Sequence, residues 1–396
     1  MPVQKHFFFF LAAALCVRAE SQVADIQQAV DLANLAAKYR AQGRPADAEP
    51  LLAKAIAVFE KYDDPGFPRV LMHAALVAHD LGNDSQAELW ARHALEVLEG
   101  QGLRDTTEAA TARNTLGIAL DGLGFEHQAL AEFERALAMR EKLLGNAHPA
   151  VAEALDKLGL AYRQTGRISE AESAYRRSLD ILIANGLSME LGTAHNNLGS
   201  LFILQGNLHD AQYEIKEAIA VWQKLLGAEH PYIAAAMMNL SNLERARHKT
   251  DEAERWCDRA LAMDRKLLAP SDARIGRDLN VAGTLAVDRK HYAEAEKLFR
   301  ESLAILSQAL PESHPDRGRV LANLGDVLRL ERRAAESDAR YKEGLDILDK
   351  AWGMEDPRLL AWLDSYAGVL RSEENFADAA KVDMQAMKIR VKASLR

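Results

Sequence analysis

The sequence predicts an all-α fold, a right-handed superhelical solenoid of about nine helix-turn-helix pairs. Apolar residues recur at helical spacing, most clearly in the two halves of residues 143–183, which Gly166 separates. Small residues recur at nearly constant intervals along the chain, and no Ser-rich or homopolymer linker interrupts them. One such pair cannot bury its apolar face alone, so the pairs are expected to stack on one another.

Residues 1–19 have the pattern of a secretory signal peptide. Lys5 precedes an apolar run over residues 7–17, and Val17 and Ala19 are the non-bulky residues that a signal peptidase reads. This run of eleven residues is shorter than the roughly 20 that a membrane span needs. We therefore expect cleavage after Ala19, export to the periplasm or out of the cell, and no transmembrane span. A buried N-terminal helix is the alternative interpretation.

The net charge and the cysteine content limit the kinds of function that this protein can have. Loss of residues 1–19 removes Lys5 and Arg18 and no acid, which takes the formal net charge from −9 to −11. A chain this acidic is not expected to bind nucleic acid. Cys257 would be the one remaining cysteine, so an internal disulfide is excluded in that mature chain. Its register within the repeat favours a buried packing role.

Nine repeats are expected over residues 20–396, each with a small anchor residue in the middle of its first helix. The anchors, spaced by 39 to 42 residues, are Ala36, Ala75, Gly117, Gly159, Gly199, Ser241, Gly283, Gly325 and Ala367. Twelve residues later comes Ala in eight repeats and Ser337 in the other. Twenty residues later the sequence has Ile, Leu or Met in every repeat. Small residues at facing positions allow the two helices of a pair to approach closely.

The segment LGLAYRQTGRISEAESAYRRSLDIL resembles a tetratricopeptide repeat in its small residue, Tyr, Gly and Ala. The 42-residue period, the junctions LGNAHP and LGAEHP, and the HNNLG segment are similar to the kinesin-light-chain subclass of that family. The resemblance covers residues 22–396. It implies a solenoid of helical pairs whose first helices line a concave surface that holds extended peptides.

A proline begins the first helix in four repeats, at Pro149, Pro231, Pro315 and Pro357. The residues before these prolines are His148, His230, His314 and Asp356. Three such histidines would lie roughly 20 Å apart given the packing distance of helices, whereas zinc needs nitrogens at about 2.0–2.1 Å. The sequence therefore predicts helix caps and no metal site.

The residue that closes the turn inside each pair differs between the first five repeats and the last four. Glycine closes the first helix in repeats one to five, and His248, Lys290, Arg332 and Glu374 stand at that position in repeats six to nine. A non-glycine residue in the left-handed region costs about 1–2 kcal/mol. We therefore expect the last four turns to close differently.

No catalytic or nucleotide-binding signature occurs in the sequence. There is no Gly-Lys pair for a phosphate-binding loop, and no HExxH, GxSxG or dinucleotide fingerprint. We therefore expect no catalysis and no cofactor. An enzyme with a dispersed groove site is the less favoured alternative.

The expected concave positions carry asparagines and arginines, most densely in repeats six to eight. An amide both donates and accepts, so a ladder of asparagines can hold a peptide backbone, or can bridge neighbouring helices instead. Arginine binds carboxylates through two parallel bonds. We predict a site for a peptide, with an acidic segment or a C-terminal carboxylate, at Asn196, Asn197, Asn239, Asn242, Arg245, Arg277, Asn280, Arg319, Asn323 and Arg329.

The last expected helix has apolar residues that no further repeat of this sequence covers, including Met384, Met387 and Val391. Either the neighbouring lysines and arginines solvate this edge or the edge packs on another copy. The sequence thus favours an exported, non-catalytic scaffold or adaptor that holds a protein partner. An architectural protein that self-assembles through its C-terminal repeat is the alternative.

Overall fold

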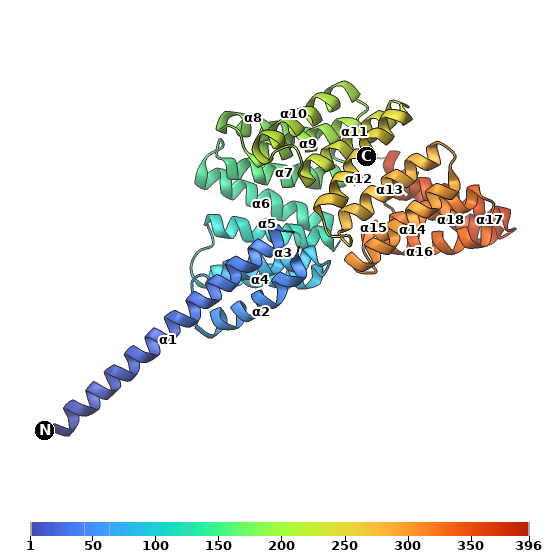
Figure 1. Cartoon of the computed structure of the whole chain (residues 1–396). Helices are drawn as coiled ribbons and strands as arrows, with labels where there is room; N and C mark the ends of the chain where they lie inside the picture. Colours follow the sequence, from blue (N-terminus) through green and yellow to red (C-terminus); the bar gives the residue numbers. More distant parts are fainter. Residues whose placement is uncertain (1, 43, 63, 124, 395–396) are drawn as a thin grey trace. The chain divides into compact units, whose positions relative to one another are not determined.

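The structure, a computed structural model, describes residues 2–42, 44–62, 64–123 and 125–394, with side chains described from residue 21 to residue 392 of these ranges. The chain divides into two compact units, Met1–Leu143 and Leu144–Arg396. Both units consist of antiparallel helical pairs joined by short turns (Figure 1). The predicted all-α solenoid of helical pairs is confirmed.

The described residues of the first unit form three pairs. Its helices are α1 (Pro2–Ala41), α2 (Pro45–Tyr62), α3 (Phe67–Asp80), α4 (Asp84–Gly100), α5 (Thr107–Gly122) and α6 (Glu126–Leu144). Residues 1–19, where we expect the signal peptide, fall on the N-terminal half of α1 or before it, and their side chains lie outside the described residues. Among the described residues, no helix combines the length and apolar composition that a membrane crossing requires.

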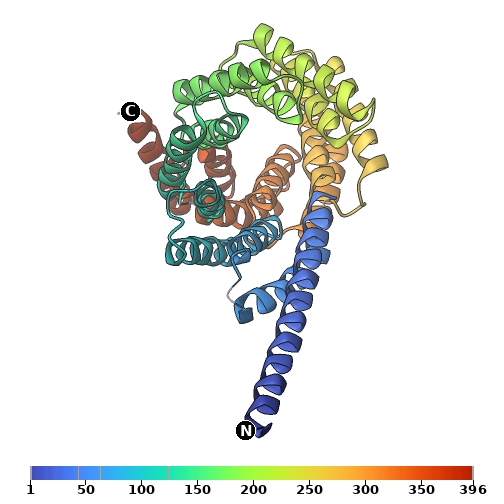
Figure 2. The same ribbon diagram turned by 90° about the vertical axis from the view of Figure 1, so that its left-hand side faces the viewer.

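In the second unit, residues 144–394 form six pairs that follow a curved path (Figure 2). Its helices are α7 (Pro149–Gln164), α8 (Ile168–Asn185), α9 (Met189–Leu204), α10 (Leu208–Leu226), α11 (Pro231–Ala246), α12 (Thr250–Leu267), α13 (Ala273–Asp288), α14 (Tyr292–Ala309), α15 (Pro315–Leu330), α16 (Ala334–Trp352), the 3-10 turn η1 (Pro357–Leu359), α17 (Leu360–Ser372) and α18 (Phe376–Ser394).

The anchor residues hold the two helices of each pair together. A Cβ atom added at Gly159 would lie 2.7 Å from the ring of Tyr175, which is buried. The same close approach occurs between Gly283 and Phe299, at 2.6 Å. In repeat six the anchor is Ser241, whose hydroxyl donates to the carbonyl of Ala253, and the facing position is the buried Cys257. A large side chain thus faces glycine in these two repeats, and a smaller one faces serine in repeat six.

The last four turns correct one expectation. His248, Lys290, Arg332 and Glu374 adopt positive φ angles of 60°, 64°, 63° and 59°, close to the 75° and 76° of Gly166 and Gly206. These turns therefore close as the glycine turns do, and the prediction of a different closure was wrong. The helices that follow begin in the same way, because packing of the second helix onto the first fixes the turn against the local preference of the side chain.

The junction residues cap the first helices, as predicted. The Nδ1 atoms of His148, His230 and His314 accept from the backbone N–H two residues later at 3.1, 3.2 and 3.1 Å. Asp356 does the same through Oδ1 at 2.8 Å. Each histidine cap needs a lone pair on Nδ1, so the capping imidazole carries its proton on Nε2.

Candidate functional site

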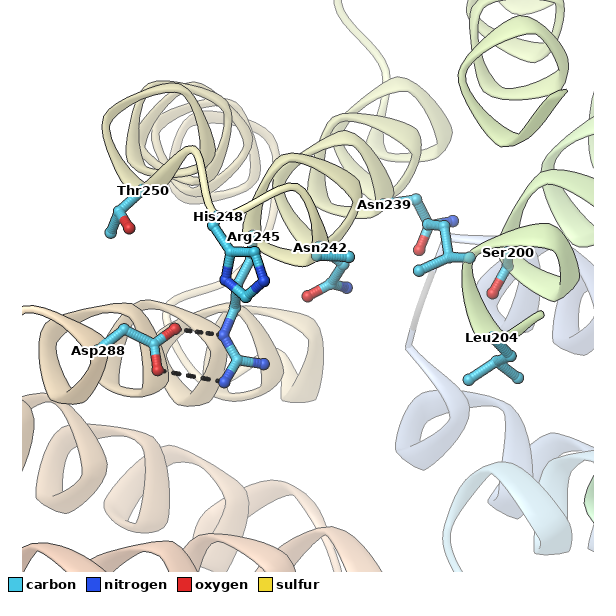
Figure 3. Close-up of a pocket in the computed structure, with 10 residues that line it drawn as sticks. Ser200, Leu204, Asn239, Asn242, Arg245, His248, Thr250 and Asp288 are labelled. Atoms are coloured by element: carbon cyan, nitrogen blue, oxygen red, sulfur yellow. Dashed lines mark hydrogen bonds and ion pairs between the residues drawn. The ribbon is translucent and has the colours of Figure 1, made fainter. Parts of the chain in front are cut away.

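A groove pocket of about 640 Å³ lies on the second unit, where the first helices of repeats five, six and seven run side by side (Figure 3). One wall is apolar and comes from α9, where Leu204 is 65% exposed. The floor carries the amides of Asn239 and Asn242 from α11, and the opposite wall carries Arg245 and Asp288. The remaining lining residues are Ser200, Ile203, Ala246, His248 and Thr250.

The asparagines bridge neighbouring repeats. Nδ2 of Asn239 on α11 donates to Oδ1 of Asn196 on α9 at 2.9 Å. Asn323 on α15 donates to Asn280 on α13 at the same distance, and Trp362 donates to Asn323 at 3.0 Å. The bridging interpretation of these four amides therefore holds. These bridges do not use every donor and acceptor of the amides, since each amide has two donor hydrogens and two acceptor lone pairs.

Asn242 differs from those four residues. It is half-buried and lines the pocket. Within the described part of the chain, no hydrogen bond occupies its side chain. Figure 3 shows its amide pointing into the space between Arg245 and Asn239. Asn242 is therefore the amide in this pocket that is available for both a donor and an acceptor of a ligand.

Each arginine of the predicted site has a carboxylate partner. Nε of Arg245 lies 2.5 Å from Oδ2 of Asp288, and a second contact joins Nη2 to Oδ1 at 3.3 Å. Nη2 of Arg329 lies 3.5 Å from Oδ1 of Asp326. The excess of basic residues along the groove is thus largely neutralised within the chain, and a ligand carboxylate has to compete with these aspartates.

Two of the predicted arginines share one buried carboxylate. Nε of Arg277 on α13 lies 2.5 Å from Oδ2 of Asp316, and Arg319 on α15 donates to Oδ1. Burial alone would raise the pKa of Asp316, but the charges of Arg319 and Arg277 outweigh it and hold this pKa at about 2. Two guanidinium groups on one carboxylate leave a net charge of +1, and both arginines are more than 40% exposed.

The structure brings only part of the predicted site together. Asn239, Asn242 and Arg245 line the pocket. The other predicted residues lie on α9, α13 and α15 outside its lining, and they are Asn196, Asn197, Arg277, Asn280, Arg319, Asn323 and Arg329.

The apolar wall of the pocket was not predicted from the sequence, because only charged residues and amides were considered at the concave positions. Leu204 lies five residues after anchor Gly199, and Asp288 lies five residues after anchor Gly283. The exposed leucine at this register was the available signal.

No group of three or more His, Cys, Asp or Glu side chains that could hold a metal ion occurs among the described residues. The three junction histidines instead cap helices α7, α11 and α15. The groove pocket thus combines one apolar wall, the amide of Asn242 and the ion pair of Arg245 and Asp288.

Comparison with known proteins agrees with the repeat architecture of helical pairs. Tetratricopeptide repeat models match residues 34–101, 107–184, 190–266, 235–308 and 277–350. Protein KINESIN LIGHT CHAIN-RELATED 1 of Arabidopsis thaliana is 21% identical over 185 residues, which are 36% of this chain and 30% of that protein. The chain spans at most 30% of the length of the curated relatives it matches.

Two solved structures share the fold over most of the chain. A Rap protein complexed with competence and sporulation factor has a TM-score of 0.65 at 14% identity, and the match covers 93% of this chain and all of that one (100%). The APC/C hetero-tetramer Cut9-Hcn1 has a TM-score of 0.57 at 15% identity, over 86% of this chain and 55% of that one.

Proposed function

The chain belongs to the tetratricopeptide repeat family, with repeats of the kinesin-light-chain type, and from this premise we propose that it is an exported, non-catalytic scaffold that holds a peptide segment of a partner protein in its groove. The observation that carries the proposal is the pocket between α9 and α13, with the free amide of Asn242 beside the apolar wall of Leu204. The amide serves any peptide backbone, and the wall takes an apolar side chain of the partner.

Similar folds support the choice of function class. The Rap protein was solved complexed with competence and sporulation factor, and Cut9 was solved in a hetero-tetramer with Hcn1. Both are solenoids seen with a bound partner. A scaffold function is therefore favoured over an enzyme with a dispersed groove site.

We propose that the partner segment is acidic or ends in a free carboxylate. The support is the pair Arg277 and Arg319 on Asp316, which leaves a net positive charge on α13 and α15. The guanidinium hydrogens that do not reach Asp316 are positioned by it, so a ligand carboxylate gains bonds at little cost in side-chain entropy.

The test uses peptide selection followed by affinity measurement. Peptides selected on the wild-type chain are titrated against an Arg277→Ala, Arg319→Ala, Asp316→Asn triple variant. Asp316→Asn is included because removal of both arginines alone would leave a buried carboxylate without a partner. We expect acidic peptides to bind at least tenfold more weakly to the triple variant than to an Asp316→Asn control. Equal affinity for both variants would refute the acidic ligand.

Export is tested separately by the mass of the mature chain. We propose that residues 1–19 are removed on export to the periplasm or beyond, with the apolar run over residues 7–17 as support. Intact mass of the protein purified from its native host should correspond to a chain beginning at Glu20. A full-length chain recovered from the cytosolic fraction would contradict export.

A second candidate function rests on α18. Met384, Met387 and Val391 are 59%, 64% and 50% exposed on this helix. In the other repeats the residue equivalent to Met387 is buried or half-buried. We propose self-association through this face as the alternative to a monomeric scaffold. Light scattering separates the two candidates. Self-association is supported if the wild type is a dimer or larger and a Met384→Lys, Met387→Lys variant is monomeric. A monomeric wild type excludes self-association.

A further inference from the structure

Two aspartates interrupt apolar columns of the repeat. Asp264 on α12 lies 23 residues after anchor Ser241, a register at which most repeats have Phe, Leu or Trp. Asp278 on α13 lies five residues before anchor Gly283, a register at which six repeats have Ala or Val. An acid at a position that packs as core elsewhere must have a compensating interaction, since an isolated buried carboxylate is costly.

The two carboxyl groups are neighbours on the packed helices α12 and α13. Asp264 is 3% exposed and Asp278 is 8% exposed. The two carboxyl groups lie close enough that each affects the pKa of the other. Oδ1 of Asp264 and Oδ2 of Asp278 are buried, and neither atom has a hydrogen-bond partner among the described residues. Two carboxylates have only acceptors, so a hydrogen bond between them requires that one of the two carries a proton.

The positively charged groups around the pair are bound to other carboxylates and do not neutralise it in place of that proton. Arg274 is an opposing charge that acts on both carboxyl groups, but its guanidinium is held by Asp272 at 3.0 and 3.2 Å. Arg277 is held in turn by Asp316 at 2.5 Å. The charged groups that act on the pair are Asp272, Arg274 and Arg277 at α13. These groups adjoin Tyr232 on α11 and Asp316 on α15, and Asp278 also acts on the thiol of Cys257 on α12.

Burial and the neighbouring carboxyl group both favour the protonated form. Burial and the charge of Asp264 together raise the pKa of Asp278 to about 8, and burial is the larger cause. Burial also raises the pKa of Asp264. Because these values lie above that of an unfolded aspartate, near 4, the stabilisation by the pair is complete below that pH. It is lost as the pH rises through about 8.

We propose that Asp264 and Asp278 form a proton-dependent latch between α12 and α13. With one shared proton the carboxyl pair holds repeats six and seven together. When that proton leaves, two adjacent carboxylates repel each other at a buried junction, and the junction loosens. Asp288, which holds Arg245 in the groove pocket, lies further along the same helix α13. A consequence for ligand binding therefore rests on the proposed function, whereas the latch itself does not.

Hydrogen exchange of the full chain without ligand tests the latch. Exchange is followed at pH 6 and pH 9 and corrected for the intrinsic exchange rate. We expect amides of α12 and α13 to lose at least tenfold in protection at pH 9, with little change in α9 and α10. In an Asp278→Asn variant the amide donates permanently to Asp264, so we expect this pH dependence to disappear.

Matched variants separate the latch from a general effect of charge. Asp258→Asn removes an exposed acid from the same helix α12 and should leave the pH dependence of the wild type intact. Asp264→Asn provides a second test if Asp278→Asn does not fold. Protection of α12 and α13 that is equal at both pH values in the wild type overturns the proposal. So does wild-type pH dependence in both Asn variants.

Discussion

The guanidinium of Arg245 donates to both carboxylate oxygens of Asp288, which comes 43 residues later on the first helix of the next repeat. The first unit repeats this relationship between Arg40 and Asp80, at 2.6 and 3.5 Å. In both cases the arginine lies four residues after its anchor and the aspartate five residues after the next anchor. The groove therefore presents basic side chains whose charge the following repeat already balances.

Asp288→Asn is expected to strengthen the binding of acidic peptides. The substitution frees Arg245 from its carboxylate, and an exposed ion pair is worth about 0.2–1 kcal/mol, so affinity should rise by roughly two- to fivefold. Fluorescence anisotropy with a labelled acidic peptide measures the change. A matched peptide with Gln in place of Glu should not respond, and neither should the Asp258→Asn control. Weaker binding of the acidic peptide by Asp288→Asn would show that Asp288 itself contacts the ligand.

Gly159→Ala is expected to destabilise the second unit. The added Cβ would meet the ring of the buried Tyr175 at 2.7 Å, and overpacking of this kind costs about 1–3 kcal/mol. Gly368→Ala is the control, because Gly368 is exposed on α17 and a Cβ there meets no atom within 4 Å. That substitution should stabilise the protein by about 0.5–1 kcal/mol. Urea unfolding compares the two variants, and equal midpoints would contradict the packing account.

Substitutions at two equivalent left-handed turn positions are expected to change the stability of the protein in opposite directions. Lys290→Gly removes a strain of about 1–2 kcal/mol and adds about 0.5–1 kcal/mol of chain entropy, so a net stabilisation of up to about 1 kcal/mol is expected. Gly206→Lys introduces the same strain at a φ of 76° and should destabilise the protein. Thermal unfolding of both variants measures this difference. A stabilising Gly206→Lys would mean that the turns tolerate side chains without strain.

His230→Asn is expected to change how stability depends on pH. Burial, assisted by Arg274, lowers the pKa of His230, and protonation of Nδ1 abolishes the cap to Tyr232. The contribution of this cap is thus complete above the unfolded pKa of about 6.5 and is lost as the pH falls through the lower folded value. Asparagine caps a helix without titrating. The loss in unfolding midpoint between pH 7 and pH 5 should be smaller in the variant, and an equal loss would exclude His230 as its source.

The repeat register could be predicted from the sequence because steric constraints fix it locally. Each anchor must be small where it faces a side chain such as Tyr175 or Phe299, so the constraint appears in every repeat. The caps at His148, His230 and His314 were also predicted, since a cap is a contact between residues two positions apart. The turn at Lys290 was predicted wrongly, because packing of the following helix overrides the preference of one residue.

The site could be predicted only in part, since its contacts join different repeats. The sequence places Arg245 on the groove, but the partner Asp288 depends on how two helices stack. The bridge from Asn239 to Asn196 is of the same kind. The carboxyl pair of Asp264 and Asp278 had a signal, an acid in an apolar column, although only stacking brings the two columns together.

The central claim, a partner segment held in the groove pocket, is tested most directly by site-specific photocrosslinking in the native host. A photoreactive phenylalanine replaces Leu204, which is 65% exposed in the pocket, or Tyr213, which is 58% exposed on α10 outside the pocket lining. We predict a discrete crosslinked partner from position 204 that is lost when Asn242→Ala is added, and no such adduct from position 213. Adducts of equal yield from both positions, or adducts at 204 that survive Asn242→Ala, would contradict the account.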